Sequence, residues 1–274
     1  MKKGEKIRLY LFALLAVLLI LTAVFGERLA PFDPLESDFT ASLLPPGGEH
    51  LCGTDKLGRD VFSRILAGAG RSFFLTFLMV AITFLIGTTV GLLSGYRGGA
   101  ADHILTGLCD ILLAFPDSVF AIAVAGILGA GIFHTVFALG LIWWTKYARL
   151  SRTLTLSVGN RDYIWQAKFA GARTGRILFK YILPEILPQL LTAAALDVGN
   201  MMLALAGLSF LGLASQPPAP EWGYMLYESR QYMQTAPWMM IFPGLALLLS
   251  VGVFNLLGDA VRDALSPGTR KINT

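Results

Sequence analysis

Charged residues are scarce in this chain. They make up 15% of its 274 residues, whereas hydrophobic residues make up 55%. Soluble domains carry roughly 25% charged residues, so the composition excludes an ordinary soluble domain and indicates an integral membrane protein. The chain also has only two cysteines, Cys52 and Cys109, which do not make a disulfide framework.

Catalytic and nucleotide-binding motifs are absent from the sequence. It contains no GxxxxGK[ST] phosphate-binding loop, so we expect the chain not to bind ATP itself. It also has no nucleophile–base pair and no close group of metal-ligating residues, so we predict no enzymatic activity, cofactor or metal site in this chain. Internal repeats and low-complexity tracts are missing too, which favours a single membrane domain.

Long apolar runs predict an all-α protein with six transmembrane helices. The runs lie at 9–25, 72–96, 104–128, 133–147, 186–213 and 237–258. The basic first residues put the N-terminus in the cytoplasm, and six spans then place the C-terminus and most of the 22 lysines and arginines there too. This bias explains the net charge of +4 without a nucleic-acid partner. A cleaved signal peptide is the alternative for the first run.

Polar and small residues occur inside several of these runs. Gly87, Gly91 and Gly95 have small-xxx-small spacing, which predicts a close contact between helices. Asp117 follows Pro116, where a kinked helix would expose backbone carbonyls beside the carboxylate. Asp117 is therefore a candidate for a translocation path, and the alternative is a helix cap or a polar tie between helices.

One group of polar and sulfur-containing residues lies within two helical turns. Asp197 and Met201 should share a helix face, with Asn200 and Met202 close by. Since carboxylate, amide and thioether groups together suit the passage of a cation or its complex, these four residues are candidates for a translocation path. Methionine is also a common core residue, so packing is the alternative.

A basic segment at 163–184 (YIWQAKFAGARTGRILFKYILP) lies between apolar runs, which predicts a cytoplasmic location. Its apolar stripe, including Trp165 and Phe169, predicts a short helix that ends at Gly171, a residue free to take a positive φ. A second helical piece is predicted to run to Pro184. We therefore expect a docking surface on one membrane face; a basic loop that only fixes topology is the alternative.

This segment resembles the cytoplasmic EAA loop of ABC-importer permeases, which reads E-A-A, three residues, G, nine residues, I-x-L-P. The chain departs from that pattern at Trp165, Gln166 and Tyr181. The resemblance implies a coupling helix seated in a groove of an ATPase subunit, with Trp165 as an apolar anchor in place of the usual Glu. The residues expected to take part in coupling are Trp165, Gln166, Ala167, Phe169, Gly171, Leu183 and Pro184.

Two segments on the outer side carry the same resemblance. Residues 53–60 read GTDKLGRD and match, almost letter for letter, the GTDxxGRD signature of the peptide and nickel branch of these permeases. The stretch LSFLGLA…PPAPEWG also matches that branch, with Ala214 where glycine is usual. The outer loop at 214–236 that contains it should be a stiff lid or docking ledge.

The GTDKLGRD string has a physical interpretation of its own. Asp55 and Asp60 flank Arg59 closely enough to predict a local ion-pair network, and Gly53 and Gly58 allow tight turns. No base or nucleophile accompanies the two aspartates, so the string is not a catalytic motif. The residues singled out in it are Gly53, Thr54, Asp55, Gly58, Arg59 and Asp60.

Together these motifs identify the chain, by resemblance, as a C-type permease subunit of a binding-protein-dependent ABC importer of the dipeptide, oligopeptide and nickel family. The resemblance implies the type I permease fold, the bacterial inner membrane, a heterodimer with a second permease, two ATPase subunits that bind ATP and Mg, and an extracytoplasmic solute-binding protein. It divides the chain into an N-terminal helix and outer segment (1–70), a permease core with its coupling loop (71–265; 150–185), and a cytoplasmic tail (266–274).

Residues 196–265 resemble nickel-transport permeases more than dipeptide permeases, notably at LDVGNMML and ESRQY. This resemblance predicts nickel, free or in a metal–metallophore complex, as the solute. A dipeptide or oligopeptide importer is the alternative within the family. A non-transporting membrane scaffold or a channel is the alternative of a different class.

Overall fold

A computed structural model describes residues 3–214, 217–218 and 220–265. Within these ranges every regular element is a helix, and the only strand-like pairing is an isolated bridge between Thr54 and Asp60. The predicted all-α class is therefore confirmed. The predicted tail at 266–274 lies outside the described residues.

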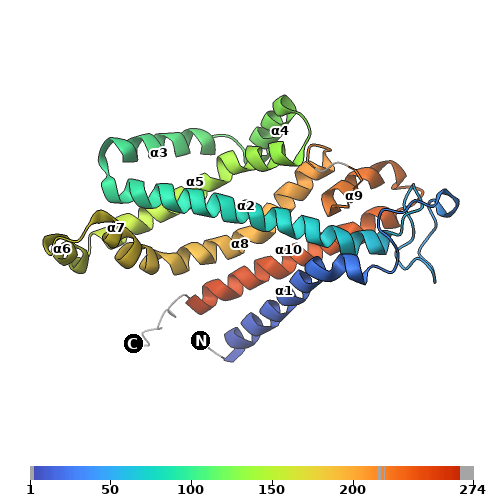
Figure 1. Cartoon of the computed structure of the whole chain (residues 1–274), viewed down its shortest axis with the longest axis horizontal. Coiled ribbons are helices and arrows are strands. Elements are labelled where there is room, and N and C mark those ends of the chain that lie inside the picture. The colour runs from blue at the N-terminus through green and yellow to red at the C-terminus, as the bar shows by residue number, and fades with distance from the viewer. Residues whose placement is uncertain (1–2, 215–216, 219, 266–274) are drawn as a thin grey trace, which may run out of the picture.

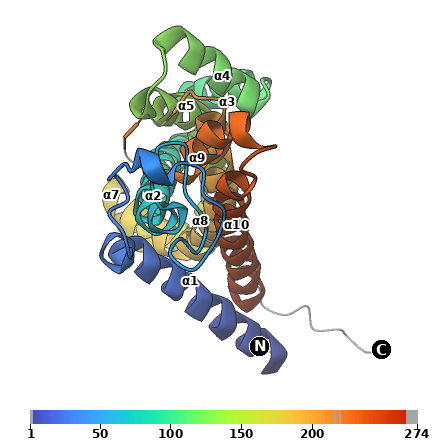
Figure 2. The same ribbon diagram turned by 90° about the vertical axis from the view of Figure 1, so that its right-hand side faces the viewer.

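Five long helices form an elongated bundle (Figure 1). They are α1 (Lys3–Leu29), α2 (Val61–Arg97), α5 (Ile132–Gly159), α8 (Leu183–Phe210) and α10 (Trp238–Leu265). Helix α2 is central, since it packs against both α1 and α5, and α8 packs against α10. Seen end-on in Figure 2, α1 and the pair α3–α4 lie on opposite sides of α2.

Shorter elements lie along one side of the bundle, as α3 and α4 do, or near its ends. They are α3 (Gly99–Leu113), α4 (Asp117–Leu128), α6 (Asp162–Phe169), α7 (Thr174–Arg176), a π-helical turn (Ile177–Ile182), α9 (Trp222–Ser229) and two 3-10 turns (Phe39–Ala41, Arg230–Tyr232). In Figure 1, α6 lies at one end of the bundle. Helix α1 begins, and α10 ends, on the side nearer to α6. The irregular segment 30–60 and α9 lie at the opposite end, as the predicted topology requires.

Four helices in the described part of the chain are long and apolar enough to cross a membrane. They are Gly4–Leu29, Val61–Arg97, Thr174–Phe210 and Trp238–Ala264, and the pair α3–α4 makes a fifth if it counts as one span. Helix α5 is long enough but not apolar enough to count as a span, because Lys146, Arg149 and Arg152 lie within it. Composition and length therefore give four or five spans, where six were predicted from the sequence.

Several predicted boundaries were wrong because helices continue past the apolar runs. Helix α2 begins at Val61, where the Asp60 carboxylate accepts a hydrogen bond from the Ser63 amide at 2.7 Å and caps the helix. Helix α5 continues to Gly159, so Lys146 lies on a helix and not at the start of a loop. Helix α10 likewise continues to Leu265.

The predicted span at 104–128 is broken in two. Helices α3 and α4 meet at an angle of 87°, with Ala114 ending the first and Pro116 preceding the second. Proline disfavours helical backbone at the residue before it, here Phe115, which explains the break. Asp117 is then the first residue of α4 and is half-buried.

The glycine stripe of α2 packs directly on α5, as predicted. A Cβ atom at Gly87 would lie 2.3 Å from the Trp144 carbonyl oxygen, and one at Gly91 would lie 2.2 Å from that of Ala148. At Gly95 the nearest atom, the Arg152 carbonyl oxygen, would be 2.9 Å away. Only glycine permits this approach between the two backbones.

Pro184 does not end the second helical piece. The chain is helical without interruption from Thr174 to Phe210. Just before the proline, the backbone forms a π turn, in which the Leu183 amide donates to the Leu178 carbonyl, five residues back. Pro184 has no N–H to donate, so this position of the continuous helix lacks one backbone hydrogen bond, and it directly follows the π turn.

Candidate functional site

Helix α6 presents two aromatic side chains to solvent. Trp165 is 47% exposed and Phe169 is 86% exposed, and their ring centroids lie 6.4 Å apart at positions i and i+4. On the opposite side Ile164 is fully buried and anchors the helix to the bundle. Exposed aromatic pairs of this kind are typical of protein contacts, in which aromatic residues carry much of the binding energy.

The helix ends as the sequence predicts. Gly171 has φ +77°, and its amide donates to the Lys168 carbonyl at 3.0 Å, while the Ala172 amide donates to that of Ala167 at 3.0 Å. These bonds satisfy carbonyls at the end of α6 and reverse the chain towards α7. Among the other predicted coupling residues, Gln166 and Pro184 are exposed, and Leu183 is half-buried.

Polar contacts fix α6 to the beginning of α8. The Glu185 carboxylate accepts hydrogen bonds from Arg161 and from the Tyr163 hydroxyl. Partial burial and the bond to Glu185 raise the pKa of Tyr163. The Lys168 ammonium lies 4.4 Å from the centre of the Trp165 ring. The contacts of Arg161 and Tyr163 with Glu185 therefore join α6 to the first turn of α8.

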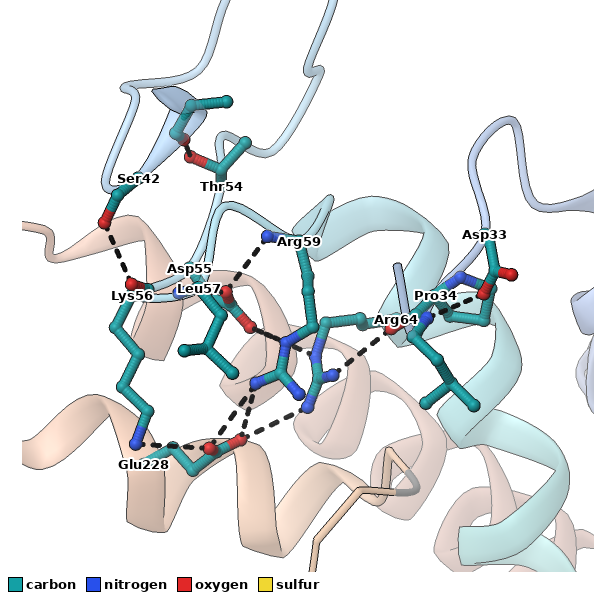
Figure 3. Close-up of polar contacts among 12 residues, drawn as sticks. Asp33, Pro34, Ser42, Thr54, Asp55, Lys56, Leu57, Arg59, Arg64 and Glu228 are labelled. Atoms are coloured by element: carbon teal, nitrogen blue, oxygen red, sulfur yellow. Dashed lines mark hydrogen bonds and ion pairs between the residues drawn. The ribbon is translucent and has the colours of Figure 1, made fainter. Parts of the chain in front are cut away.

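At the opposite end of the bundle, buried charges join the two outer segments (Figure 3). The Arg59 Nε lies 2.6 Å from Asp55 Oδ2. The Glu228 carboxylate, on α9, lies 3.2 Å from Arg64, 3.4 Å from Arg59 and 3.4 Å from Lys56. We call these five residues the outer charge cluster. Asp55 also lies 3.5 Å from Arg64, so the two buried arginines share two carboxylates, and loss of either carboxylate would leave buried positive charge undercompensated.

The predicted local network is only partly correct. Arg59 pairs with Asp55, but Asp60 instead caps α2 and lies 2.9 Å from His50 Nδ1. The predicted tight turns are present, with φ +71° at Gly53 and +75° at Gly58. A Cβ atom at Gly58 would lie 1.7 Å from the Asp38 carbonyl oxygen, so glycine is required there.

The Thr54 side chain joins the GTDKLGRD segment to the loop that precedes it. Its hydroxyl donates to the Ala41 carbonyl at 2.5 Å and accepts from the Leu44 amide at 2.8 Å. Sequence reasoning did not single out Arg64 or Glu228. In the segment GTDKLGRDVFSR, basic residues outnumber acidic ones. This excess could have predicted an acidic partner from another segment.

The predicted translocation residues do not form one group in the structure. Met201 and Met202 are buried in the main hydrophobic core, whereas Asn200 is exposed. Asp197 lies beside Lys146 of α5, with 3.9 Å between Oδ1 and Nζ. No group of three or more His, Cys, Asp or Glu side chains suited to a metal occurs in the described ranges.

Comparisons with known proteins agree with the fold and with these motifs. Residues 87–271 match the family described as "Binding-protein-dependent transport system inner membrane component". The chain is 42% identical to the dipeptide transport system permease protein DppC of Haemophilus influenzae, over 94% of this chain and 90% of the relative. It is 44% identical to the glutathione transport system permease protein GsiD of Pectobacterium atrosepticum, over 93% and 85%.

A nickel permease and a solved transporter are also similar. The nickel transport system permease protein NikC of Escherichia coli K12 is 38% identical, over 93% of this chain and 92% of the relative. A chain of the inward-facing MetNI methionine ABC transporter shares the fold, with a TM-score of 0.53 and 20% identity over 73% of this chain and 95% of that one. The chain is therefore a multi-pass inner-membrane protein and belongs to the permeases of binding-protein-dependent ABC importers, in the dipeptide, oligopeptide and nickel branch.

Proposed function

We propose that this chain is one of two permease subunits that together form the translocation path of an ABC importer, and that α6 is its coupling helix. The proposal rests on how α6 is attached to the bundle and on which of its side chains are exposed. Helix α6 exposes Trp165 and Phe169 to a partner while Ile164 and Glu185 hold it to the bundle. Such a helix is suited to dock in an ATPase subunit and to pass its movement to α8.

The proposed assembly contains a second permease in a heterodimer, two ATPase subunits and an extracytoplasmic solute-binding protein. ATP and Mg would bind to the ATPase subunits, and this chain would have no catalytic role. Both termini would be cytoplasmic, with α5 as the sixth span. At 28 residues, α5 is about 42 Å long and exceeds the roughly 30 Å hydrocarbon core. Its charges would face the interior of the assembly.

For the solute, a small peptide has at least as much support as nickel. Identity over nearly the whole chain is 42% to a dipeptide permease and 44% to a glutathione permease, against 38% to a nickel permease. Nickel, free or in a metal–metallophore complex, is the second candidate because of that last relative. Residues proposed to face the path are Asp117, Asp197 and Asn200.

The test is solute uptake in cells that lack this chain and in cells complemented with it or with variants. We expect a labelled dipeptide to enter only complemented cells, and Phe169→Ala to reduce uptake at least tenfold, since the docking anchor is lost. Phe179→Ala is the matched control. Phe179 is 65% exposed in the same loop but outside α6, and its replacement should leave uptake within twofold.

Nickel uptake measured in the same cells separates the two solutes. Loss of nickel uptake alone on deletion would make nickel the solute. Normal uptake of both solutes by the Phe169→Ala cells, with the variant present in the membrane, would contradict the coupling role of α6.

A further inference from the structure

Lys146 and Asp197 form an ion pair between the middle parts of α5 and α8. The outer ends of α5 and α8 are level, because the Gly131 amide donates to the Leu213 carbonyl at 2.9 Å. Lys146 and Asp197 lie near the middle of these helices, which is roughly 20 Å from their outer ends at 1.5 Å per residue. In the proposed topology, in which α5 is a span, the hydrocarbon core is about 30 Å thick, so both charges would lie within it.

The pair is not enclosed by this chain. The Lys146 side chain is 43% exposed and that of Asp197 is 14% exposed. A half-exposed ammonium facing lipid at this depth would be strongly unfavourable, and charged residues in membrane spans face other protein segments or water. The face that carries Lys146 must therefore be covered by another subunit or border an aqueous path.

Further exposed polar groups lie about one helical turn from each member of the pair. Arg149, one turn from Lys146, lies 3.5 Å from Asp110 of α3, and both side chains are more than half exposed. On α8, Asn200 is exposed one turn beyond Asp197. Each cation on this face has an anion beside it, so the surface carries both signs of charge in neutral pairs.

The geometry of the Lys146–Asp197 pair leaves both groups able to bind a solute. At 3.9 Å the two atoms attract each other but are too far apart for a charge-assisted hydrogen bond, which is about 2.8 Å long. Lys146 Nζ also lies 4.2 Å from the centre of the Trp143 ring, which holds the ammonium in place. The ammonium has three donors and the carboxylate several acceptor sites.

We propose that Lys146 and Asp197 form a selectivity site for zwitterionic solutes on the translocation path. At this site Lys146 attracts the carboxylate of the solute, and Asp197 attracts its ammonium group. This inference rests on the proposed permease function and assigns it a solute class. A bare divalent cation would meet the Lys146 ammonium beside the carboxylate it needs, and Met201 and Met202 are buried away from this face. A molecule with one charge of each sign satisfies both groups.

The test compares transport of two blocked dipeptides of similar size, an N-acetylated one that keeps only its carboxylate and a C-amidated one that keeps only its ammonium. Uptake is measured at saturating concentration in cells that express the complete importer. Lys146→Gln should lower the ratio of acetylated to amidated dipeptide uptake about fivefold, because the carboxylate loses its partner, and Asp197→Asn should raise the ratio by a similar factor. Lys146→Arg and Asp197→Glu keep the charges and should leave the ratio within twofold.

If the Lys146–Asp197 pair only holds α5 and α8 together, the variants should give a different result. Each neutral variant would then slow both dipeptides by the same factor and leave the ratio unchanged, which would overturn the proposal. Failure of the wild-type importer to carry the unmodified dipeptide would instead contradict the proposed peptide function, so this uptake is measured before any variant is compared.

Solvent access gives a second readout if the glutamine variant fails to assemble. Lys146→Cys should react with a water-soluble thiol reagent in the complete importer, and solute should slow the reaction at least threefold. Leu248→Cys is the matched control, since Leu248 is 66% exposed near the middle of α10 and should face lipid and stay unlabelled. A Lys146→Cys importer that transports solute but does not react with the reagent would overturn the proposal.

Discussion

Glu228 joins segments of the chain that lie far apart in sequence. Its carboxylate contacts Arg59 and Arg64, which precede it by 169 and 164 positions, and thereby fastens α9 to the beginning of α2. The side chains of the two arginines are at most 5% exposed, and that of Glu228 is 9% exposed. Water therefore screens these charges weakly, and each depends on the others for compensation.

Glu228→Gln should destabilise the protein by about 3 kcal/mol, because two buried arginines lose their shared anion. Thermal unfolding of the purified importer in detergent, followed by tryptophan fluorescence, would measure the loss as a lower Tm. Glu36→Gln is the control, since Glu36 is an exposed acid in the same outer segment. Equal Tm values for both variants would show that the outer charge cluster does not stabilise the fold.

Local features of single residues could be predicted from sequence, but distant partners could not. The positive φ of Gly58 and of Gly171 follows from residue type and spacing, as does the pairing of Arg59 with Asp55, four residues earlier. Glu228 and Lys146 acquire their roles only when separate helices come together. Their partners depend on the packing of the bundle, which the order of residues along one segment does not reveal.

At the scale of elements, the contact between α2 and α5 depends on small residues. Gly91→Ala would place a methyl group 2.2 Å from the Ala148 carbonyl oxygen, so the two helices must separate. We expect it to lower stability by about 2 kcal/mol through overpacking. Gly140→Ala on α5 is the matched control, because its added methyl group would meet no atom within 4 Å and alanine favours the helix.

The measurement is again the Tm of the purified importer, together with the yield of assembled complex. Gly91→Ala should lower both, while Gly140→Ala should leave them unchanged or slightly raised. If Gly91→Ala matched the wild type, the close packing of α2 on α5 would not be required for assembly.

Element boundaries were harder to predict than element type. Apolar runs located the spans, yet α2, α5 and α10 all extend into charged sequence because caps and ion pairs stabilise their ends. The Arg152 guanidinium, for example, pairs with Asp102 of α3 with 2.6 Å between Nη2 and Oδ2. Two prolines had opposite effects, since Pro116 separates α3 from α4 whereas Pro184 lies within continuous helix.

At the scale of the whole molecule, the two ends of the bundle differ in construction. One end carries α6, an exposed helix fixed by a few contacts, and the other carries the buried outer charge cluster (Figures 1 and 3). In the proposed importer, the first end is the site of ATPase docking. Phe169, at 86% exposure in this chain, must then lie against an ATPase subunit in the assembled complex.

Cysteine cross-linking of Phe169→Cys to the co-expressed ATPase subunit tests this claim most directly. The native thiols of Cys52 and Cys109 are buried, and burial raises the pKa of Cys52, so a reagent with one thiol-reactive and one amine-reactive end should attach at the new thiol and link it to a nearby lysine of the ATPase subunit. Phe39→Cys, at an outer position of 73% exposure, is the control. We predict a cross-linked permease–ATPase product from position 169 and none from position 39; an active importer that gives no product at 169 would contradict the docking role of α6.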